Sequence, residues 1–178
     1  MKRAFAIIFA MILILGLAGC GGQSKQETSE NAYELDKLNS ISFFVPTDWE
    51  RKAGDNSSIV CYPGYEAASV VSVWEESVSD DNSFENEANR DLYVFVYTYD
   101  CDDYSPELTE YVTIADCPGV HHVFNYSSNG NPTTCELYAF TSDNQLYAFT
   151  SICGADAEDS IKDDLSKSLA RIIESVSI

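Results

Sequence analysis

The sequence has few basic residues. Ten Lys and Arg stand against 29 Asp and Glu, which gives a formal net charge of -19. Proteins bind nucleic acid and anionic membrane surfaces mainly through Lys and Arg, so this deficit argues against both as partners. The charge is consistent with a soluble acidic domain, and it leaves room for a basic partner or a cation.

Sequence motifs of catalysis and metal binding are missing as well. The chain has no nucleophile elbow, no phosphate-binding loop, no HExxH and no dinucleotide-binding fingerprint. It has no Cys-x-x-Cys. His121 and His122 are the only histidines, and as neighbours on a strand they would point to opposite faces. We therefore assign no catalytic residue, no metal and no cofactor.

One acidic stretch invites a calcium interpretation. Its acids are Asp100, Asp102, Asp103, Glu107 and Glu110. An EF-hand loop needs Gly at its sixth position and Glu at its twelfth. Counted from Asp100, these positions hold Ser105 and Tyr111. The pattern fails, and we predict a solvated acidic loop over 100–106.

Long apolar runs are also scarce, and the only one lies at the start. Lys2 and Arg3 precede an apolar run over 4–17, which is shorter than the roughly 18 to 20 residues that span a bilayer. This layout is typical of a secretory signal. The run ends in Leu-Ala-Gly-Cys, at Cys20, and so resembles the bacterial lipoprotein signal. The alternatives are an uncleaved anchor and an ordinary secretory signal.

The lipoprotein resemblance implies a location. In that family the cysteine thiol receives a diacylglycerol and the chain is cut just before it. We therefore expect a signal peptide over 1–19 and a lipid on Cys20. Two acyl chains would give a stable, extracytoplasmic attachment to the cell membrane. The polar stretch over 20–32 predicts a flexible tether that spans roughly 20 Å. Residues 33–178 suit a single domain.

The domain is predicted to contain strands before and after one helix, and to end in a second helix. Runs of β-branched and aromatic residues predict strands over 40–45, 49–52, 58–62, 67–74, 108–115, 120–126, 133–141 and 146–152. The last two form the clearest hairpin, with Tyr138 and Phe140 as cross-strand neighbours of Tyr147 and Phe149. Turns are predicted at Cys117-Pro118-Gly119 and at Asn129-Gly130, where Pro132 lengthens the loop.

Both helices are predicted from apolar residues at helical spacing. The first covers about 83–97, and its stripe is Phe84, Ala88, Leu92, Phe95 and Tyr99. The acids Glu85, Glu87 and Asp91 fit its exposed face. The second covers about 156–175 and is expected to pack on the sheet through Leu165, Leu169 and Ile172. The fold class is therefore α+β, with a mainly antiparallel sheet and helices on its faces.

The order of these elements and four local motifs resemble the PsbP-like fold. The motifs are FFVPTDW over 43–49, CPGVHHVFNY over 117–126, the final hairpin, and IIESVSI over 172–178. That group includes the extrinsic P subunit of photosystem II, a Ran-binding nuclear transport factor and small bacterial lipoproteins of the DcrB type. The resemblance implies a domain that binds partners. It carries over no functional residue.

The cysteines leave several pairings open. Besides Cys20 there are five, an odd number: Cys61, Cys101, Cys117, Cys135 and Cys153. A two-residue hairpin turn would place Cys135 opposite Ile152 and exclude a Cys135–Cys153 bridge, whereas a three-residue turn would bring the two together. We favour Cys101–Cys117, with Cys61 unpaired. In an anaerobic host all five would stay thiols.

The function predicted from the sequence is a membrane-anchored, non-catalytic binding or protein-interaction module. A small hydrolase that uses carboxylates, and a lipoprotein that binds a solute or cation, are the alternatives. The partners expected are the membrane, through the lipid on Cys20, and an unidentified protein or small molecule. Four aromatics form a candidate ligand patch, with core packing as the alternative: Trp49, Tyr62, Tyr65 and Trp74.

Overall fold

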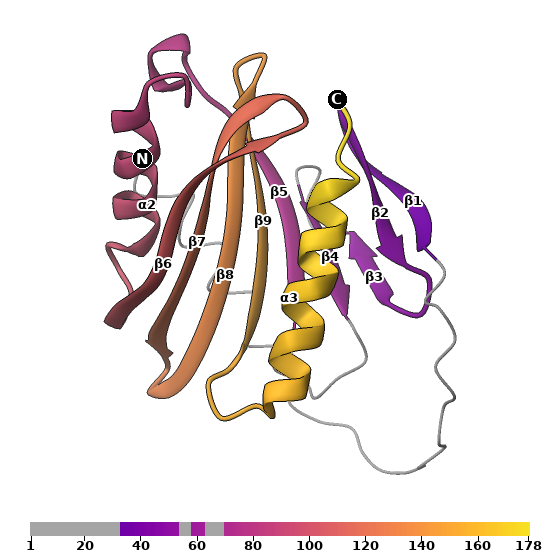
Figure 1. The fold of residues 1–178 in the computed structure, drawn as a ribbon, viewed down its shortest axis with the longest axis vertical. Helices are drawn as coiled ribbons and strands as arrows, with labels where there is room; N and C mark the ends of the chain where they lie inside the picture. Colours follow the sequence, from indigo (N-terminus) through magenta and orange to yellow (C-terminus); the bar gives the residue numbers. More distant parts are fainter. Residues whose placement is uncertain (1–32, 54–57, 63–69) are drawn as a thin grey trace. The chain divides into compact units, whose positions relative to one another are not determined.

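A seven-stranded antiparallel sheet forms the centre of the fold (Figure 1). The computed structural model describes residues 33–53, 58–62 and 70–178, and in this part of the chain the sheet is joined by a two-stranded hairpin and two α-helices. The strand order is β3-β4-β5-β9-β8-β7-β6, and each neighbouring pair is antiparallel. The predicted α+β class is confirmed.

The strands and helices follow the predicted order. The strands are β1 (Tyr33–Leu38), β2 (Ile41–Pro46), β3 (Glu50–Ala53), β4 (Ser58–Tyr62), β5 (Val70–Ser77), β6 (Asp102–Ile114), β7 (Cys117–Ser128), β8 (Asn131–Ser142) and β9 (Gln145–Gly154). A 3-10 turn, η2 (Asp80–Asn82), precedes the helix α2 (Glu87–Thr98), and α3 (Asp159–Glu174) follows the last strand. In the described part of the chain, no helix has the length and apolarity to cross a membrane.

Three tight turns set the register of the long strands. The turns are Ala115-Asp116, Asn129-Gly130 and Asp143-Asn144, and all six residues have positive φ. Two-residue turns with positive φ at both positions match the right-handed twist of the strands that they join. Each turn therefore continues directly into a paired strand, with Ile114 opposite Cys117, Ser128 opposite Asn131 and Ser142 opposite Gln145.

Two predicted turns differ from the observed ones. The turn predicted at Cys117-Pro118-Gly119 is wrong, because the chain reverses at Ala115-Asp116 and β7 begins at Cys117. A Cβ at Gly119 would lie 2.7 Å from the carbonyl oxygen of Ala139, so this glycine allows β7 and β8 to approach closely. Pro132 does not lengthen the next turn, because it lies in β8 opposite Ser127.

The acidic loop predicted over 100–106 is mostly strand, so that prediction is wrong. β6 begins at Asp102 and pairs with β7 on one side only, as the edge of the sheet. The register shifts between Asp102 and Ser105 and again between Pro106 and Leu108. An edge strand tolerates Pro106 and these irregularities because its outer hydrogen-bonding side has no ladder to interrupt.

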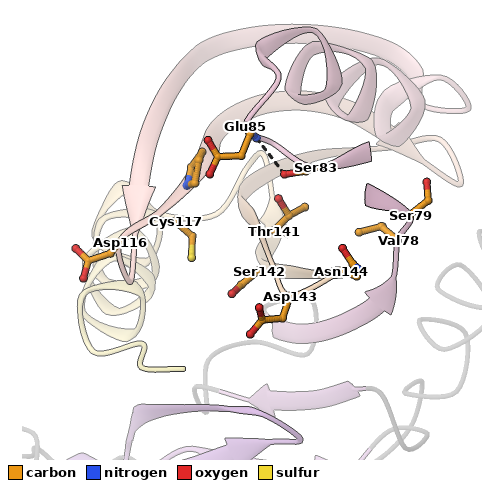
Figure 2. A pocket seen from close by; sticks show the side chains of 11 residues that line it. Val78, Ser79, Ser83, Glu85, Asp116, Cys117, Thr141, Ser142, Asp143 and Asn144 are labelled. Carbon is orange, nitrogen blue, oxygen red and sulfur yellow. Dashed lines mark hydrogen bonds between the residues drawn. The ribbon is translucent and has the colours of Figure 1, made fainter. Parts of the chain in front are cut away.

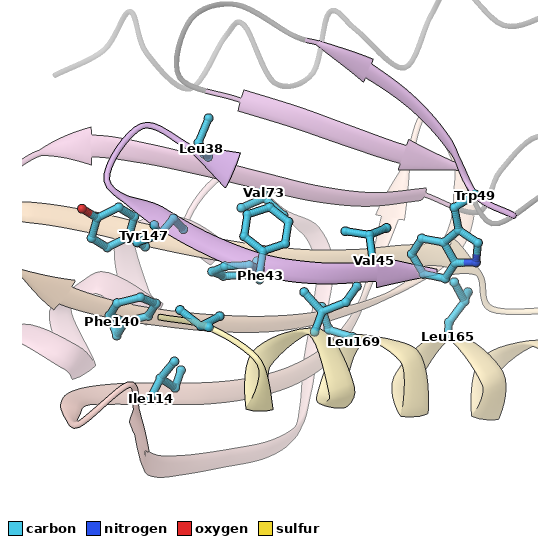
Figure 3. Packing of buried hydrophobic residues seen from close by; sticks show 14 of the residues in the cluster. Leu38, Phe43, Val45, Trp49, Val73, Ile114, Phe140, Tyr147, Leu165 and Leu169 are labelled. Carbon is cyan, nitrogen blue, oxygen red and sulfur yellow. The ribbon is translucent and has the colours of Figure 1, made fainter. Parts of the chain in front are cut away.

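The larger core lies between one face of the sheet, the β1–β2 hairpin and α3 (Figure 3). Its fully buried aromatic residues are Phe43 from β2, Phe140 from β8, and Tyr147 and Phe149 from β9. The predicted cross-strand pairs are confirmed, since Tyr138 lies opposite Phe149 and Phe140 opposite Tyr147. The helix α3 enters this core through the three predicted residues, Leu165, Leu169 and Ile172, which are all buried.

A second core lies on the opposite face of the sheet, under α2. Side chains alternate along a strand, so the residues between those of the first core point here. They include Val120, Leu137, Ala139, Leu146 and Ala148, and all five are buried. The helix α2 begins at Glu87, later than predicted, because the side chain of Asn86 accepts the backbone N–H of Ala88 and caps it.

The docking of α3 can be tested with Leu169→Ala. Leu169 is fully buried, so we expect its truncation to lower the free energy of unfolding by about 2 to 5 kcal/mol. Lys167→Ala is the matched control on the same helix, because this side chain is 71% exposed and surface changes usually stay within about 0.5 kcal/mol. Urea unfolding measures both. Equal effects of the two substitutions would show that α3 is not packed in this way.

Candidate functional site

The helix α2 presents a row of large apolar side chains to solvent. Leu92 is 54% exposed, Phe95 60%, Val96 42% and Tyr99 71%. Three of them belong to the stripe from which the helix was predicted, so the part of that stripe from Leu92 onward faces outward, whereas Phe84, which precedes the helix, is buried. We call these four residues the outer α2 face. Single exposed apolar residues are ordinary, but a contiguous group of them marks an interaction site.

The side of α2 that packs on the sheet is also apolar, which explains why the outer α2 face points away from the sheet. Val94 is buried, and the rings of Tyr93 and Tyr97 pack between the helix and the sheet. Tyr97 meets Phe124 of β7 edge to face, with 6.2 Å between ring centroids. The helix therefore has two apolar sides, and the sheet covers only one of them.

Acidic residues precede and follow the outer α2 face in the sequence. Asp91, Asp100, Asp102 and Asp103 are all exposed. Arg90 is the only Lys or Arg between Lys52 and Lys162 in the sequence.

Arg90 does not offset this charge at the surface, because its side chain is only 10% exposed. The guanidinium lies 3.4 Å from the carboxylate of Glu87 and 4.1 Å from the centre of the Tyr111 ring of β6. The hydroxyl of Tyr111 donates to Asp91 at 2.7 Å, and this bond raises the pKa of Tyr111. The outer α2 face is thus apolar with an acidic border.

A small pocket of about 210 Å³ lies where two hairpin turns meet the segment before α2 (Figure 2). It is lined by Val78, Ser79, Ser83, Glu85, Asp116, Cys117, Pro118, Thr141, Ser142, Asp143 and Asn144. Ligand pockets usually measure about 300 to 1,000 Å³ and are mostly apolar. This pocket is smaller and mainly polar, so it does not have the character of a solute site.

His121 takes part in an ion-pairing cluster on the sheet face that carries α3. Its Nε2 lies 2.9 Å from Glu136 Oε1, and its Nδ1 lies 3.8 Å from Glu110 Oε2. The ring stacks on Tyr138 with 4.0 Å between centroids. Burial raises the pKa of Tyr138, and the neighbouring Glu136 raises it further. The groups that contact His121 are two carboxylates and an aromatic ring. A catalytic base that activates a nucleophile needs that nucleophile beside it, and these contacts do not supply one.

His122 points to the other face, as predicted, and is fully buried. Its Nδ1 lies 2.9 Å from the carbonyl oxygen of Leu108, which can only accept, so Nδ1 carries the proton. Its Nε2 then accepts from the hydroxyl of Tyr104 at 3.0 Å. Burial lowers the pKa of His122 and keeps the ring neutral. These contacts provide hydrogen-bond partners for both histidines within the folded structure.

The candidate aromatic ligand patch does not form as predicted. Trp49 is 6% exposed and belongs to the α3-side core, whereas Trp74 packs under α2 on the opposite face. Core packing, the alternative, is therefore correct for both tryptophans. Tyr65 and the side chain of Tyr62 lie outside the described residues. Within the described residues, no group of three or more His, Cys, Asp or Glu side chains could hold a metal ion.

Neither disulfide considered from the sequence fits the structure. Cys101 and Cys117 lie at opposite ends of β6, which separates them by roughly 40 Å at the usual rise per residue, so the favoured bridge is wrong. Cys135 lies opposite Ile152, so the two-residue turn excludes Cys135–Cys153, as predicted. All four of these cysteines are free thiols. Burial raises the pKa of Cys101 and Cys153 and so disfavours the reactive thiolate.

Comparison with solved structures identifies the fold. Cyanobacterial PsbP from Synechocystis sp. PCC 6803 superposes with a TM-score of 0.60 at 13% identity, over 91% of this chain and 98% of that one. LpqN of Mycobacterium tuberculosis, described as involved in cell envelope biogenesis, gives 0.57 at 14% identity, over 84% and 85%. The fold is PsbP-like.

The Ran-binding protein Mog1p of Saccharomyces cerevisiae shares the fold with a TM-score of 0.58 at 7% identity, over 84% of this chain and 96% of that one. The chain spans about half (48%) of a Bacteroides thetaiotaomicron structure that it also matches, with a TM-score of 0.55 at 10% identity. No protein-family model and no curated protein matches the sequence. At these identities the likeness establishes the fold and leaves the activity open.

The buried state of His122 predicts a pH dependence of stability. In the unfolded chain His122 takes up a proton near pH 6.5, about the ordinary histidine pKa. In the folded protein the pKa of His122 is lower. The stabilisation from neutral His122 is therefore complete above this pH and decreases as the pH falls below it. We expect the difference in free energy of unfolding between the wild type and His122→Gln to shrink as the pH is lowered from about 8 to about 5.

Urea unfolding of both proteins across this range measures the difference. His121 is present in both, so its contribution cancels. A stability difference that stays constant with pH would contradict the neutral, buried state of His122.

Proposed function

We propose that the protein is an extracytoplasmic lipoprotein, anchored through Cys20, whose domain is a non-catalytic protein-interaction module. The observation that carries this proposal is the outer α2 face. The whole chain has a net charge of -19, which favours solubility, yet its domain places four large apolar side chains together in water. Such a surface is favourable only when something covers it.

The character of the outer α2 face is that of an interface core. Aromatic side chains are enriched at the centres of protein interfaces and contribute most of the binding free energy there. Phe95 lies in the middle of this face and Tyr99 at its C-terminal end, and exposed acidic residues stand next to it in the sequence. The pocket of Figure 2 gives the solute-binding alternative less support, because it is small and polar.

The structural comparisons are compatible with this function. Mog1p is a Ran-binding protein, and LpqN is involved in cell envelope biogenesis. These properties belong to those proteins, and they support the proposal because the same fold occurs in a Ran-binding protein and in a protein involved in cell envelope biogenesis. The tether over 20–32 would keep the domain close to the membrane surface, where envelope partners are found.

The anchor can be tested by fractionation of host cells. We expect the wild-type protein to sediment with membranes and Cys20→Ser to move to the soluble extracytoplasmic fraction, because the substitution removes the site of both acyl chains. Mass spectrometry of the wild type should show a diacylglyceryl adduct on an N-terminal peptide. Membrane association of a processed Cys20→Ser protein would refute the lipid anchor.

The interaction can be tested by photo-crosslinking in intact cells. A photoreactive residue in place of Phe95 should give one discrete protein adduct, because this side chain would lie within the interface. The same residue in place of Lys167, which is also mainly exposed but lies on α3, is the control and should give none. Absence of a discrete adduct at Phe95, or identical adducts at both positions, would count against an interaction module.

A further inference from the structure

We propose that the outer α2 face binds an amphipathic helix of a partner protein, whose apolar side is flanked by Lys and Arg. This inference rests on the interaction function proposed above and names the chemistry of the partner. Three properties of the face support it: the spacing of its apolar side chains, their order before binding, and the sign of the surrounding charge.

The spacing fits a helical partner. Leu92, Phe95 or Val96, and Tyr99 follow the i, i+3 or i+4, i+7 pattern along two turns of α2. The seven steps from Leu92 to Tyr99, at about 1.5 Å each, give a row about 10 Å long. A second helix can present a matching row at the same spacing, so that the side chains of each fill the grooves of the other.

Two aromatic side chains of the face already pack together before a partner arrives. The rings of Phe95 and Tyr99 lie one turn apart with 5.7 Å between their centroids, within the range of favourable aromatic pairs. The inner side of the helix is fixed by its buried contacts with the sheet. A partner therefore meets a helix that the sheet holds in place and an aromatic pair that is already formed, which lowers the cost of ordering on binding.

The charge selects a basic partner. Exposed carboxylates stand directly before and after the row in the sequence, at Asp91 and Asp100, and Asp102 and Asp103 follow at the start of β6. Arg90, the cation next to Asp91, is buried beneath Tyr111. Opposite charges around an apolar centre raise the association rate and suppress partners of the wrong sign. Lys and Arg beside the partner's apolar side chains would meet these carboxylates.

The same charge disfavours the other two occupants of an apolar face. A second copy of this chain would bring identical carboxylates against its own, and like charges at an interface are unfavourable. Anionic lipid headgroups would be repelled in the same way, since juxtamembrane attraction needs Lys and Arg. A basic amphipathic helix fits both the apolar row and its border.

A designed peptide tests the proposal directly. The probe is a fourteen-residue amphipathic helix of Leu and Lys, titrated against the mature chain from residue 20 with Cys20→Ser. We expect binding that weakens about tenfold or more when Phe95→Ser and Tyr99→Ser are combined, because the central aromatic contacts are lost. Both side chains are mainly exposed in the free protein, so this variant should keep its melting temperature.

Two controls separate the apolar contribution from the charge. Leu35→Ser with Phe44→Ser removes an exposed apolar pair on the β1–β2 hairpin, where the two residues lie opposite each other, and should leave binding unchanged. The same peptide with Glu in place of Lys should not bind. Binding should also weaken as salt is raised, because the carboxylates are exposed and screened.

Other outcomes would overturn the proposal. Equal binding of the Lys peptide to the wild type and to the Phe95/Tyr99 variant would mean attraction by charge alone. Equal binding of the Glu peptide would remove the need for a basic partner. Concentration-dependent dimers in sedimentation that disappear in the Phe95/Tyr99 variant would identify a second copy as the occupant. Binding to phosphatidylglycerol vesicles that disappears in the same variant would identify the membrane as the occupant. A Phe95 crosslink to a partner without a basic helix would keep the interaction function and refute this inference alone.

Discussion

The two-residue turn at Asp143-Asn144 is the constraint on which the rest of the structure depends. It pairs Ser142 with Gln145 and thereby decides which face each residue of β8 and β9 occupies. The aromatic residues Phe140, Tyr147 and Phe149 then lie together in the α3-side core, and small residues such as Ala139 and Ala148 lie under α2. A slip of one residue would send both groups to the wrong face. The bulky face packs against α3 and the small residues leave room for the tyrosines of α2.

Much of the fold follows from local pattern, because the strongest signals are local. The stripe of α3 and the alternation of the final hairpin identify their buried faces directly, and both were correctly predicted. The β6–β7 turn was misplaced because Pro118-Gly119 is the stronger turn signal by composition, whereas the chain turns at Ala115-Asp116. Gly119 is needed for its closeness to Ala139 on the next strand, a contact that no short stretch of sequence reveals.

The candidate site shows the same limit more clearly. The stripe of Leu92, Phe95 and Tyr99 was visible in the sequence, but nothing local says which of the two apolar sides of α2 faces the sheet. That choice depends on how Tyr93 and Tyr97 fit over β7 and β8. The aromatic patch failed for a related reason: Trp49 and Trp74 come from elements that deliver them to opposite faces of one sheet.

The irregular β6 also bears on how this protein behaves at high concentration. A long, flat edge strand with free hydrogen-bonding groups is a template on which other chains can add strands and grow into fibrils. Here the two register shifts bend the strand, Pro106 withholds an amide donor, and Glu107 and Glu110 place negative charge along it. Chains at high concentration would meet edge to edge often. The irregular, charged strand therefore protects against aggregation. The register shifts in its first half interrupt the regular strand pattern, and the same shifts keep the sheet from extending between molecules.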